Sequence, residues 1–263
     1  MEYLSLRQIQ LEELKIAKEV DKFCNQNNIN YYLSSGSLLG AIRHGGFIPW
    51  DDDIDMWMLR PDYDRFCENF HHEEFVIKYC ENGSLHAPFA KVCNPNIKVE
   101  CENLGDTDNS LLWLDIFPVD GISSNILVRK LRYLHLGILI KEINLQRNKL
   151  TDESNSIFFT VKRLFYKDFQ MKSPDYAIKK AVEISNISRQ YEVFTTGLSG
   201  VAFSRLFFDD SIFTERSKYK FEDTKFFSFS NYDIVLKKNF GNYLELPPID
   251  KRGGHYIKAH YQQ

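Results

Sequence analysis

Residues 50–58 read Trp-Asp-Asp-Asp-Ile-Asp-Met-Trp-Met, so four aspartates stand among residues that normally fill a protein core. Successive side chains of a β-strand point to opposite faces. A strand over 51–58 therefore has an acidic face and an apolar face. The acidic face carries Asp51, Asp53 and Asp55. The apolar face carries Ile54, Met56 and Met58.

Carboxylates held side by side on a half-buried strand repel one another and lose hydration, and a cation between them keeps them ionised. Oxygen ligands alone favour Mg²⁺ or Mn²⁺. The alternative is a solvated acidic loop. The interleaved apolar residues count against it, because a solvated loop does not need them. The stretch therefore predicts a divalent-cation site.

The composition predicts a folded protein that binds no nucleic acid. The chain has 263 residues, of which 43% are hydrophobic, and a chain of this length can bury a large core. The net charge of −3 is not that of a basic nucleic-acid-binding domain. No apolar run reaches the ~20 residues that span a bilayer, and the N-terminus shows no signal peptide. We therefore expect a cytoplasmic protein.

Five cysteines include no Cys-x-x-Cys pair. The odd number predicts reduced thiols, in keeping with a cytosolic protein. A zinc site assembled from Cys67, His71, His72 and Cys80 is a weaker alternative, because the spacing of these residues is not diagnostic.

Hydrophobic periodicity changes between the two halves of the chain. The first half predicts mixed elements: helices over 5–25, 37–43 and 61–70, and strands over 31–33, 51–58, 75–80, 87–93, 97–101 and 111–117. Ser5 is the expected N-cap of the first helix, and Asn27 and Asn28 are expected to end it. The second half predicts helices over 124–150, 174–193 and 232–244, with one strand over 226–230. We therefore expect an α/β (α+β) catalytic lobe over 1–122 and a mostly helical lobe over 123–263.

Two further features of the sequence, a Gly-Ser pair and a later aspartate, accompany the acidic strand. Gly36-Ser37 lies between a strand and a helix, where backbone N–H groups bind anions and glycine permits close approach. Asp115 stands on an otherwise aromatic strand face. The order of Gly-Ser, an Asp-x-Asp strand and a later strand aspartate resembles the nucleotidyltransferase fold of the DNA polymerase β type. In that fold two metal ions clamp the attacking and leaving oxygens of a phosphoryl transfer.

A longer stretch narrows the resemblance. Residues 35–55, Ser-Gly-Ser-Leu-Leu-Gly-Ala-Ile-Arg-His-Gly-Gly-Phe-Ile-Pro-Trp-Asp-Asp-Asp-Ile-Asp, resemble the signature of the LicD family. Further blocks follow in order: Arg60-Pro61-Asp62-Tyr63, Ala90-Lys91-Val92, residues 113–121 (Trp-Leu-Asp-Ile-Phe-Pro-Val-Asp-Gly), and residues 240–248 (Phe-Gly-Asn-Tyr-Leu-Glu-Leu-Pro-Pro) with Arg252 and His255.

The resemblance implies a phosphotransferase that depends on a cytidine diphosphate (CDP) donor. The best-known members move phosphocholine from CDP-choline to a sugar hydroxyl of a bacterial surface glycan, a teichoic acid or a lipopolysaccharide precursor. The fukutin-related branch uses CDP-ribitol and carries a cysteine-rich zinc insert. This chain lacks that insert, which favours the bacterial branch. Ser37 replaces the threonine of many members, an exchange of one hydroxyl for another.

The resemblance also assigns roles to residues. Asp53, Asp55 and Asp115 are the expected catalytic residues and, with Asp51, the ligands of Mg²⁺ or Mn²⁺. The expected donor-binding residues are Gly36, Ser37, Arg43, Lys91, Arg252 and His255. Asp52 is expected on the opposite strand face, with a structural partner such as an arginine or a backbone amide.

Two other functions remain open at this point: a glycosyltransferase that uses the Asp-x-Asp to hold a metal and a sugar nucleotide, and a cation-dependent binding module without turnover. No Rossmann-like glycine pattern supports the glycosyltransferase. The basic and aromatic segment 126–172 has two interpretations. It holds a lipid-linked saccharide acceptor at the inner face of the membrane, or it is a solvated helix with an apolar packing face.

Overall fold

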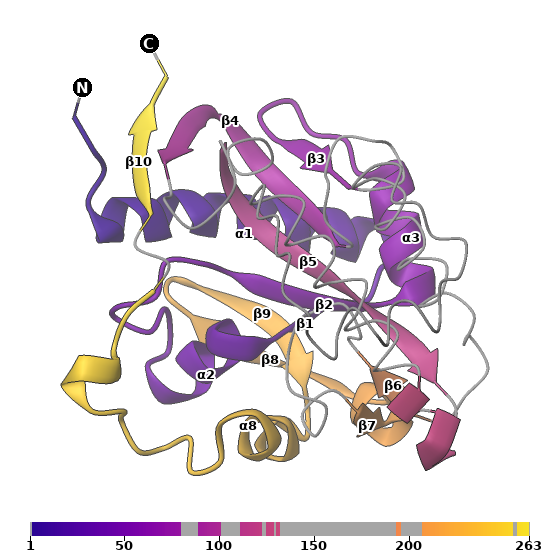
Figure 1. Ribbon diagram of the computed structural model, residues 1–263. Helices are drawn as coiled ribbons and strands as arrows, with labels where there is room; N and C mark the ends of the chain where they lie inside the picture. The colour runs from indigo at the N-terminus through magenta and orange to yellow at the C-terminus, as the bar shows by residue number, and fades with distance from the viewer. Residues whose placement is uncertain are drawn as a thin grey trace, which may run out of the picture.

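The computed structural model describes residues 2–79, 89–100, 111–122, 125–128, 130–131, 193–195, 207–254 and 257–262 (Figure 1). Its helices are α1 (Leu6–Asn27), α2 (Ser35–Arg43), α3 (Arg60–Asn69) and α8 (Tyr232–Phe240). The strands are β1 (Tyr32–Leu33), β2 (Asp55–Leu59), β3 (Val76–Lys78), β4 (Ala90–Glu100), β5 (Leu111–Ile122), β6 (Val193–Thr195), β7 (Phe207–Asp209), β8 (Arg216–Phe221), β9 (Thr224–Phe229) and β10 (Lys258–Tyr261). Short 3₁₀ turns cover Asp210–Phe213 and Ile249–Lys251.

A mixed sheet with the strand order β1-β2-β5-β4-β10 forms the centre of the molecule. Strands β2 and β5 are parallel, whereas β1 with β2, β4 with β5 and β10 with β4 are antiparallel. Helix α1 runs across one face of this sheet, behind β4 and β5 in Figure 1. Strands β8 and β9 form a separate hairpin beside β1. The expected α+β class with a mixed-sheet core is confirmed.

Helix α1 begins and ends where the sequence predicts. The Ser5 hydroxyl accepts from the backbone of Gln8, and the Gln8 side chain accepts from the backbone of Ser5, which forms a capping box. Asn28 ends the helix in the left-handed conformation. The buried stripe packs on the sheet, but it includes the polar residues Gln10 and Glu13.

The alternation of strand β2 divides the core. Met56 and Met58 point to the side covered by α1 and α3, whereas Trp57 points to the side covered by α2, α8 and β9. Ile54, just before the strand, is fully buried on the methionine side. The expected apolar face of this segment is therefore confirmed.

Two strands differ from their predicted bounds. One continuous β4 replaces the expected strands 87–93 and 97–101, because the chain absorbs Pro95 as an irregularity between Asn94 and Lys98 instead of turning. Strand β5 continues past Pro118 to Ile122, because β2 pairs with it as far as Val119 and β6 pairs with Asp120 to Ile122. In both places pairing with neighbouring strands continued through a proline (Pro95 and Pro118) that locally favours a turn.

The helices expected over 124–150 and 174–193 lie almost entirely outside the described residues, so the division into two lobes at residue 122 stays a prediction. The described part of the second half contains the β8–β9 hairpin and α8, and β10 joins the sheet of the first half. None of the helices in the described ranges is long and apolar enough to cross a bilayer.

A buried ion pair connects the end of β2 to the end of β5. Arg60 Nε and Nη2 donate to Asp120 Oδ1 and Oδ2 at 2.7 and 3.0 Å, and both side chains are 2% exposed. The planar guanidinium matches the carboxylate in a two-point contact. Two of the blocks that resemble the family are thus joined by their own charged residues.

We expect Arg60→Met to lower the free energy of unfolding by about 3–5 kcal/mol, because the substitution leaves the Asp120 charge buried and unpaired. Urea denaturation followed by circular dichroism measures the change. The control is Lys22→Met, which breaks the exposed ion pair with Glu19 and is expected to cost less than about 1 kcal/mol. Equal effects of the two substitutions would contradict a structural role for the buried pair.

Candidate active site

The aspartates gather just before strand β2. The Asp51 N–H donates to Ile48 O at 2.9 Å and closes a turn, and regular pairing with β1 and β5 covers only the residues from Asp55 onward. The predicted strand over 51–58 is therefore wrong for 51–54. Because these residues are not pleated, Asp51, Asp52 and Asp53 turn toward one another, and one carboxylate oxygen of each lies within 4.8 Å of the other two.

Asp52 thus belongs to the cluster, although an alternating strand would place it on the opposite face. Its Oδ2 accepts the backbone N–H of Ile257 at 3.3 Å, so the expected backbone-amide partner is confirmed. The side chain is 3% exposed. Asp52 therefore has two neighbours: the other aspartates and the segment that leads into β10.

The sheet brings Asp115 to the same place. It stands directly opposite Asp55 in the parallel pair of β2 and β5, and its N–H donates to Ile54 O at 3.0 Å. Trp113 Nε1 donates to Asp115 Oδ2 at 3.0 Å. Lys91 on β4 places its Nζ 3.2 Å from Asp115 Oδ1 and 3.8 Å from the centre of the Trp113 ring. The predicted proximity of Asp115 to the acidic segment is thus present.

The cluster carries an excess of negative charge. Burial, followed by the charges of Asp55, Asp51, Asp115 and Asp52, raises the pKa of Asp53 well above its ordinary value. Lys91 is buried in an ion pair with Asp115 and was expected to bind the donor diphosphate. A divalent cation fits such a set of oxygen ligands, because it supplies the positive charge that the cluster needs.

The Gly-Ser turn is built around the same aspartates. The Asp55 N–H donates to Ser37 Oγ at 2.9 Å, which joins the first turn of α2 to the start of β2. A Cβ atom on Gly36 would lie 2.6 Å from Asp51 Oδ2, so a larger residue here would displace the Asp51 carboxylate. Binding of a phosphate by Gly36 and Ser37 stays a prediction. Their observed contacts position Asp51 and Asp55.

Two arginines belong to the expected donor-binding set that the structure describes. Arg43 Nη1 donates to the carbonyls of Tyr243 and Glu245 at 2.9 and 3.3 Å, and Arg252 lies 5.0 Å from the centre of the Trp50 ring. Burial and the charge of Arg252 lower the pKa of Arg43. The structure therefore brings the two predicted donor-binding arginines near each other, while their role stays a prediction. His255 lies outside the described residues.

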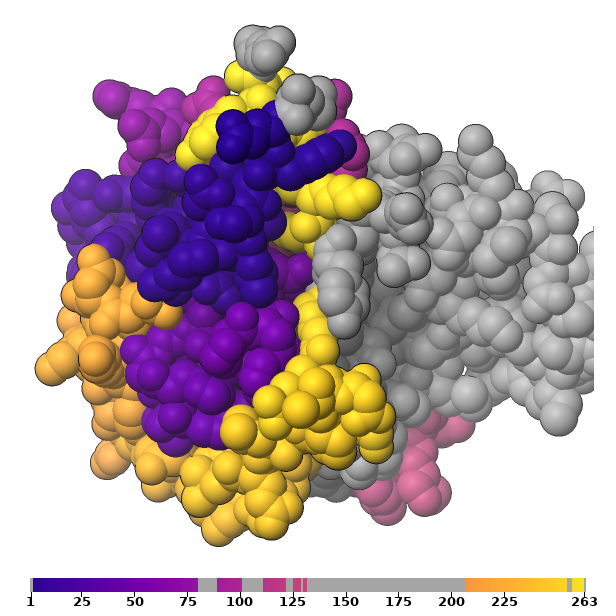
Figure 2. Space-filling view, turned by 90° about the vertical axis from the view of Figure 1, so that its left-hand side faces the viewer, coloured from indigo at the N-terminus to yellow at the C-terminus, as the bar shows by residue number. Residues whose placement is uncertain are grey.

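The C-terminal segment packs against the acidic one. A Cβ atom on Gly254 would lie 2.4 Å from Asp52 Oδ1 and 3.0 Å from Trp50 O. Farther along, the Leu4 N–H donates to Ala259 O at 2.8 Å. In Figure 2 this segment, in yellow, lies against both the residues near 50 and the N-terminal helix. Gly254 thus lies against the aspartates, while the donor-binding role of Arg252 stays a prediction.

Known protein families and relatives include the same residues. Residues 28–174 match the family model described as LicD/FKTN/FKRP, nucleotidyltransferase domain. The chain belongs to the LicD family. A relative from Haemophilus influenzae, lipopolysaccharide cholinephosphotransferase LicD, is 29% identical over 283 residues, which cover 99% of each chain. The human ribitol 5-phosphate transferase FKRP is 46% identical over 78 residues, which cover 22% of this chain and 16% of the human protein.

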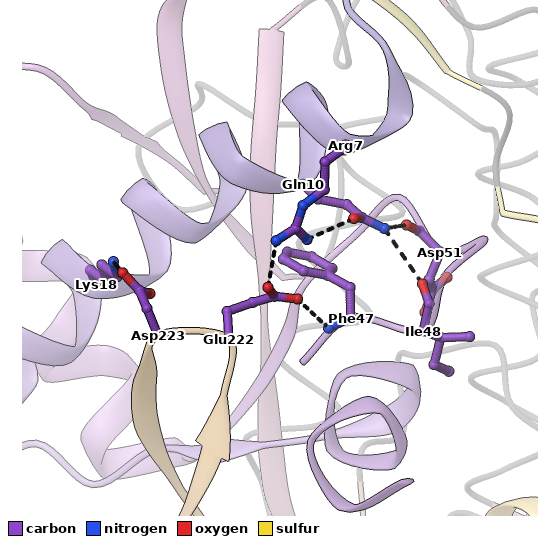
Figure 3. A network of polar contacts seen from close by, with 8 residues as sticks. All are labelled: Arg7, Gln10, Lys18, Phe47, Ile48, Asp51, Glu222 and Asp223. Atoms are coloured by element: carbon purple, nitrogen blue, oxygen red, sulfur yellow. Dashed lines mark hydrogen bonds and ion pairs between the residues drawn. The ribbon is translucent and has the colours of Figure 1, made fainter. Parts of the chain in front are cut away.

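The LicD-family match begins at residue 28, so it includes the Gly-Ser turn, the aspartates and Asp115 but omits α1. The sequence patterns predicted this helix but assigned it no contact with the site. Gln10 Nε2 donates to Asp51 O at 2.8 Å (Figure 3), and Glu13 is fully buried one turn later. The available signal was the pair of polar residues three positions apart within an apolar helical stripe.

A second contact from α1 holds the loop before the aspartates. The Glu222 carboxylate, at the tip of the β8–β9 hairpin, accepts from Arg7 at 2.5 Å and from the Phe47 N–H at 3.1 Å. A Cβ atom on Gly46 would lie 2.3 Å from the same carboxylate. Figure 3 shows the resulting chain of contacts from the hairpin through α1 to Asp51.

The alternative zinc site gains no support. Cys67 is buried in the core that α1 and α3 share, and Cys80 lies outside the described residues. Within the ranges that the structure describes, Asp51, Asp52 and Asp53 form the one group of three side chains arranged to share an ion.

The raised pKa of Asp53 predicts a pH dependence for the cation-free protein. Between the ordinary pKa of 3.8 and the higher folded value, the folded state binds more protons than the unfolded state. The resulting stability is fully present below the unfolded pKa and is lost as pH rises through the folded one. In EDTA we expect the unfolding temperature to fall from about pH 4 toward neutrality, less steeply in Asp53→Asn. A flat wild-type profile in scanning fluorimetry would contradict this.

Proposed function

We propose that this protein is a Mg²⁺- or Mn²⁺-dependent phosphotransferase that moves phosphocholine, or a related phospho-alcohol, from a CDP-linked donor to a sugar hydroxyl of a cell-surface glycan precursor. The convergence of Asp51–Asp53 before β2, Asp55 on β2 and Asp115 on the parallel neighbour β5 carries the proposal. The likeness over almost the whole chain to a lipopolysaccharide cholinephosphotransferase supports phosphocholine as the transferred group.

The carboxylates define the chemistry. When bound, a divalent cation neutralises charge on the transferring phosphoryl group. Asp53, Asp55 and Asp115 would hold it, with Asp51 beside them. The acceptor hydroxyl oxygen forms a bond to the distal phosphorus, while the bond from that phosphorus to the bridging oxygen breaks and CMP leaves with the electron pair. The proton of the hydroxyl passes to a carboxylate of the cluster.

The residues around the carboxylates have three further roles: positioning Asp115, binding the donor diphosphate and recognising the acceptor. Lys91 and Trp113 hold Asp115 in one orientation, which reduces the reorganisation needed on binding. Arg43 and Arg252 supply positive charge beside Trp50 and suit a diphosphate, because a guanidinium contacts phosphate oxygens at two points. Recognition of the acceptor is assigned to residues 122–225, most of which lie outside the described ranges.

We expect Asp53→Asn and Asp115→Asn each to reduce turnover by about 10³-fold or more, because each removes charge from the site of phosphoryl transfer. The assay measures CMP release from CDP-choline with Mg²⁺ and a glycan acceptor. Asp223→Asn is the control, because Asp223 is an exposed partner of Lys18 on the β8–β9 hairpin. Wild-type rates in either site variant, with the fold intact by circular dichroism, would refute the assignment.

Donor identity is tested by binding without turnover. We expect CDP-choline with Mg²⁺ to raise the unfolding temperature more than CDP-ribitol, CDP-glycerol or UDP-sugars at equal concentration, because stabilisation grows with the saturation of the site. Preference for CDP-ribitol would align the donor with that implied for the fukutin-related branch. Preference for a UDP-sugar would support the glycosyltransferase alternative.

Location and acceptor delivery remain proposals. Segment 126–172, which we expected either to contact a lipid-linked acceptor at the inner membrane face or to pack as a solvated helix, lies largely outside the described residues. Its described part exposes Ile126, Leu127, Val128 and Leu131. These side chains suit either interpretation.

A further inference from the structure

Glu13 is a buried carboxylate that neither the family match nor the sequence motifs include. It lies in the second turn of α1 with no exposed surface. Neither of its carboxylate oxygens has a hydrogen-bond partner in the described part of the chain. Burying a carboxyl group without a partner is costly, and glutamate is rarely fully buried without one.

The neighbours of Glu13 are the aspartates of the candidate site. Gln10 and Glu13 are three residues apart on α1, so their side chains share one face of the helix. Gln10 on that face donates to the backbone of Asp51. Burial, followed by the charges of Asp53, Asp52, Asp115 and Asp51, raises the pKa of Glu13 well above its ordinary value. The helix therefore adds an acidic side chain to a cluster that is already acidic.

A purely structural explanation of Glu13 is weak. Leucine or glutamine at this position would fill the same space without adding a carboxylate beside four others. Lys91, a buried lysine at the site, is already paired with Asp115. A divalent ion shared with the aspartates satisfies both the two unpartnered oxygens and the charge of the cluster.

We propose that Glu13 is a further ligand of the divalent cation held by the aspartate cluster, supplied by a helix outside the segment that matches the family model. This inference rests on the cation of the proposed function. It makes α1 part of the site, because the bound cation would link Glu13 on the N-terminal helix to the aspartates that precede β2. Loading with the cation alone therefore stabilises the fold, without donor or acceptor.

The test compares Glu13→Gln with Glu12→Gln. Glu12 is the adjacent residue on α1 and is also largely buried, but its carboxylate binds Lys15 and Tyr261 at 2.6 and 2.7 Å. Mn²⁺ affinity is measured from the paramagnetic resonance signal of free Mn²⁺, and unfolding temperatures are recorded in EDTA and in Mn²⁺. No substrate is present.

We expect Glu13→Gln to weaken Mn²⁺ binding about 10–100-fold, the range seen when groups that support a metal site are removed. Its unfolding temperature in EDTA stays at or above that of the wild type, because an uncompensated acid has been removed. The stabilisation by Mn²⁺ is largely lost. Glu12→Gln keeps the Mn²⁺ affinity of the wild type. A Glu13→Gln protein with wild-type Mn²⁺ affinity would falsify the proposal and show that Glu13 is a neutral buried acid.

Further variants separate this inference from the proposed function. Asp53→Asn loses Mn²⁺ binding if the aspartates form the site, whatever Glu13 does. A wild-type protein that binds no Mn²⁺, with or without CDP-choline, overturns the proposed function itself. If Glu13→Gln does not fold, Glu13→Asp keeps the charge and withdraws the carboxylate by one methylene. Weakened Mn²⁺ binding in that variant supports the inference, and unchanged binding overturns it.

Discussion

Repulsion among buried and half-buried carboxylates is the constraint around which this protein is organised. Asp51, Asp52 and Asp53 lie close together before β2, Asp115 joins them from β5, and α1 adds Glu13. Burial removes the water that would screen these charges. Many polar contacts to this segment, including those from Ser37, Gln10 and the Ile257 amide, are neutral hydrogen bonds that position the aspartates without cancelling their charge. This set of oxygen atoms suits a divalent cation.

Segments far apart in the sequence hold the acidic segment in place. The N-terminal helix, the Gly-Ser turn, the β8–β9 hairpin and the approach to β10 all contact residues 46–55. Gly36, Gly46 and Gly254 permit these approaches, because a Cβ atom on any of them would collide with a carboxylate. The geometry of the site is therefore a property of the whole fold, including both ends of the chain.

Several charged residues within the blocks that resemble the LicD family connect these blocks to one another. Arg43 reaches from α2 to the carbonyls of the 240–248 block, Arg60 joins Asp120, and Lys91 joins Asp115. Such contacts position the aspartates and the chain around them, which is a separate task from touching the substrate. The likeness to the cholinephosphotransferase over almost the whole chain is consistent with a fold whose distant blocks depend on one another.

Local patterns in the sequence were enough to predict α1 with its Ser5 cap, the apolar alternation around Met56 and the motif that brings Asp115 to the Asp-x-Asp segment, because each depends on periodicity or on a recognisable motif. Pairing between distant strands decided the rest. The pairing of β2 begins only at Asp55, so Asp52 lies outside the pleated strand and gathers with its neighbours. Pairing also carried β5 through Pro118. Gln10 and Glu13 are visible in the sequence as polar residues in the apolar stripe of α1, but only the packing of α1 on the sheet decided that Glu13 lies among the aspartates.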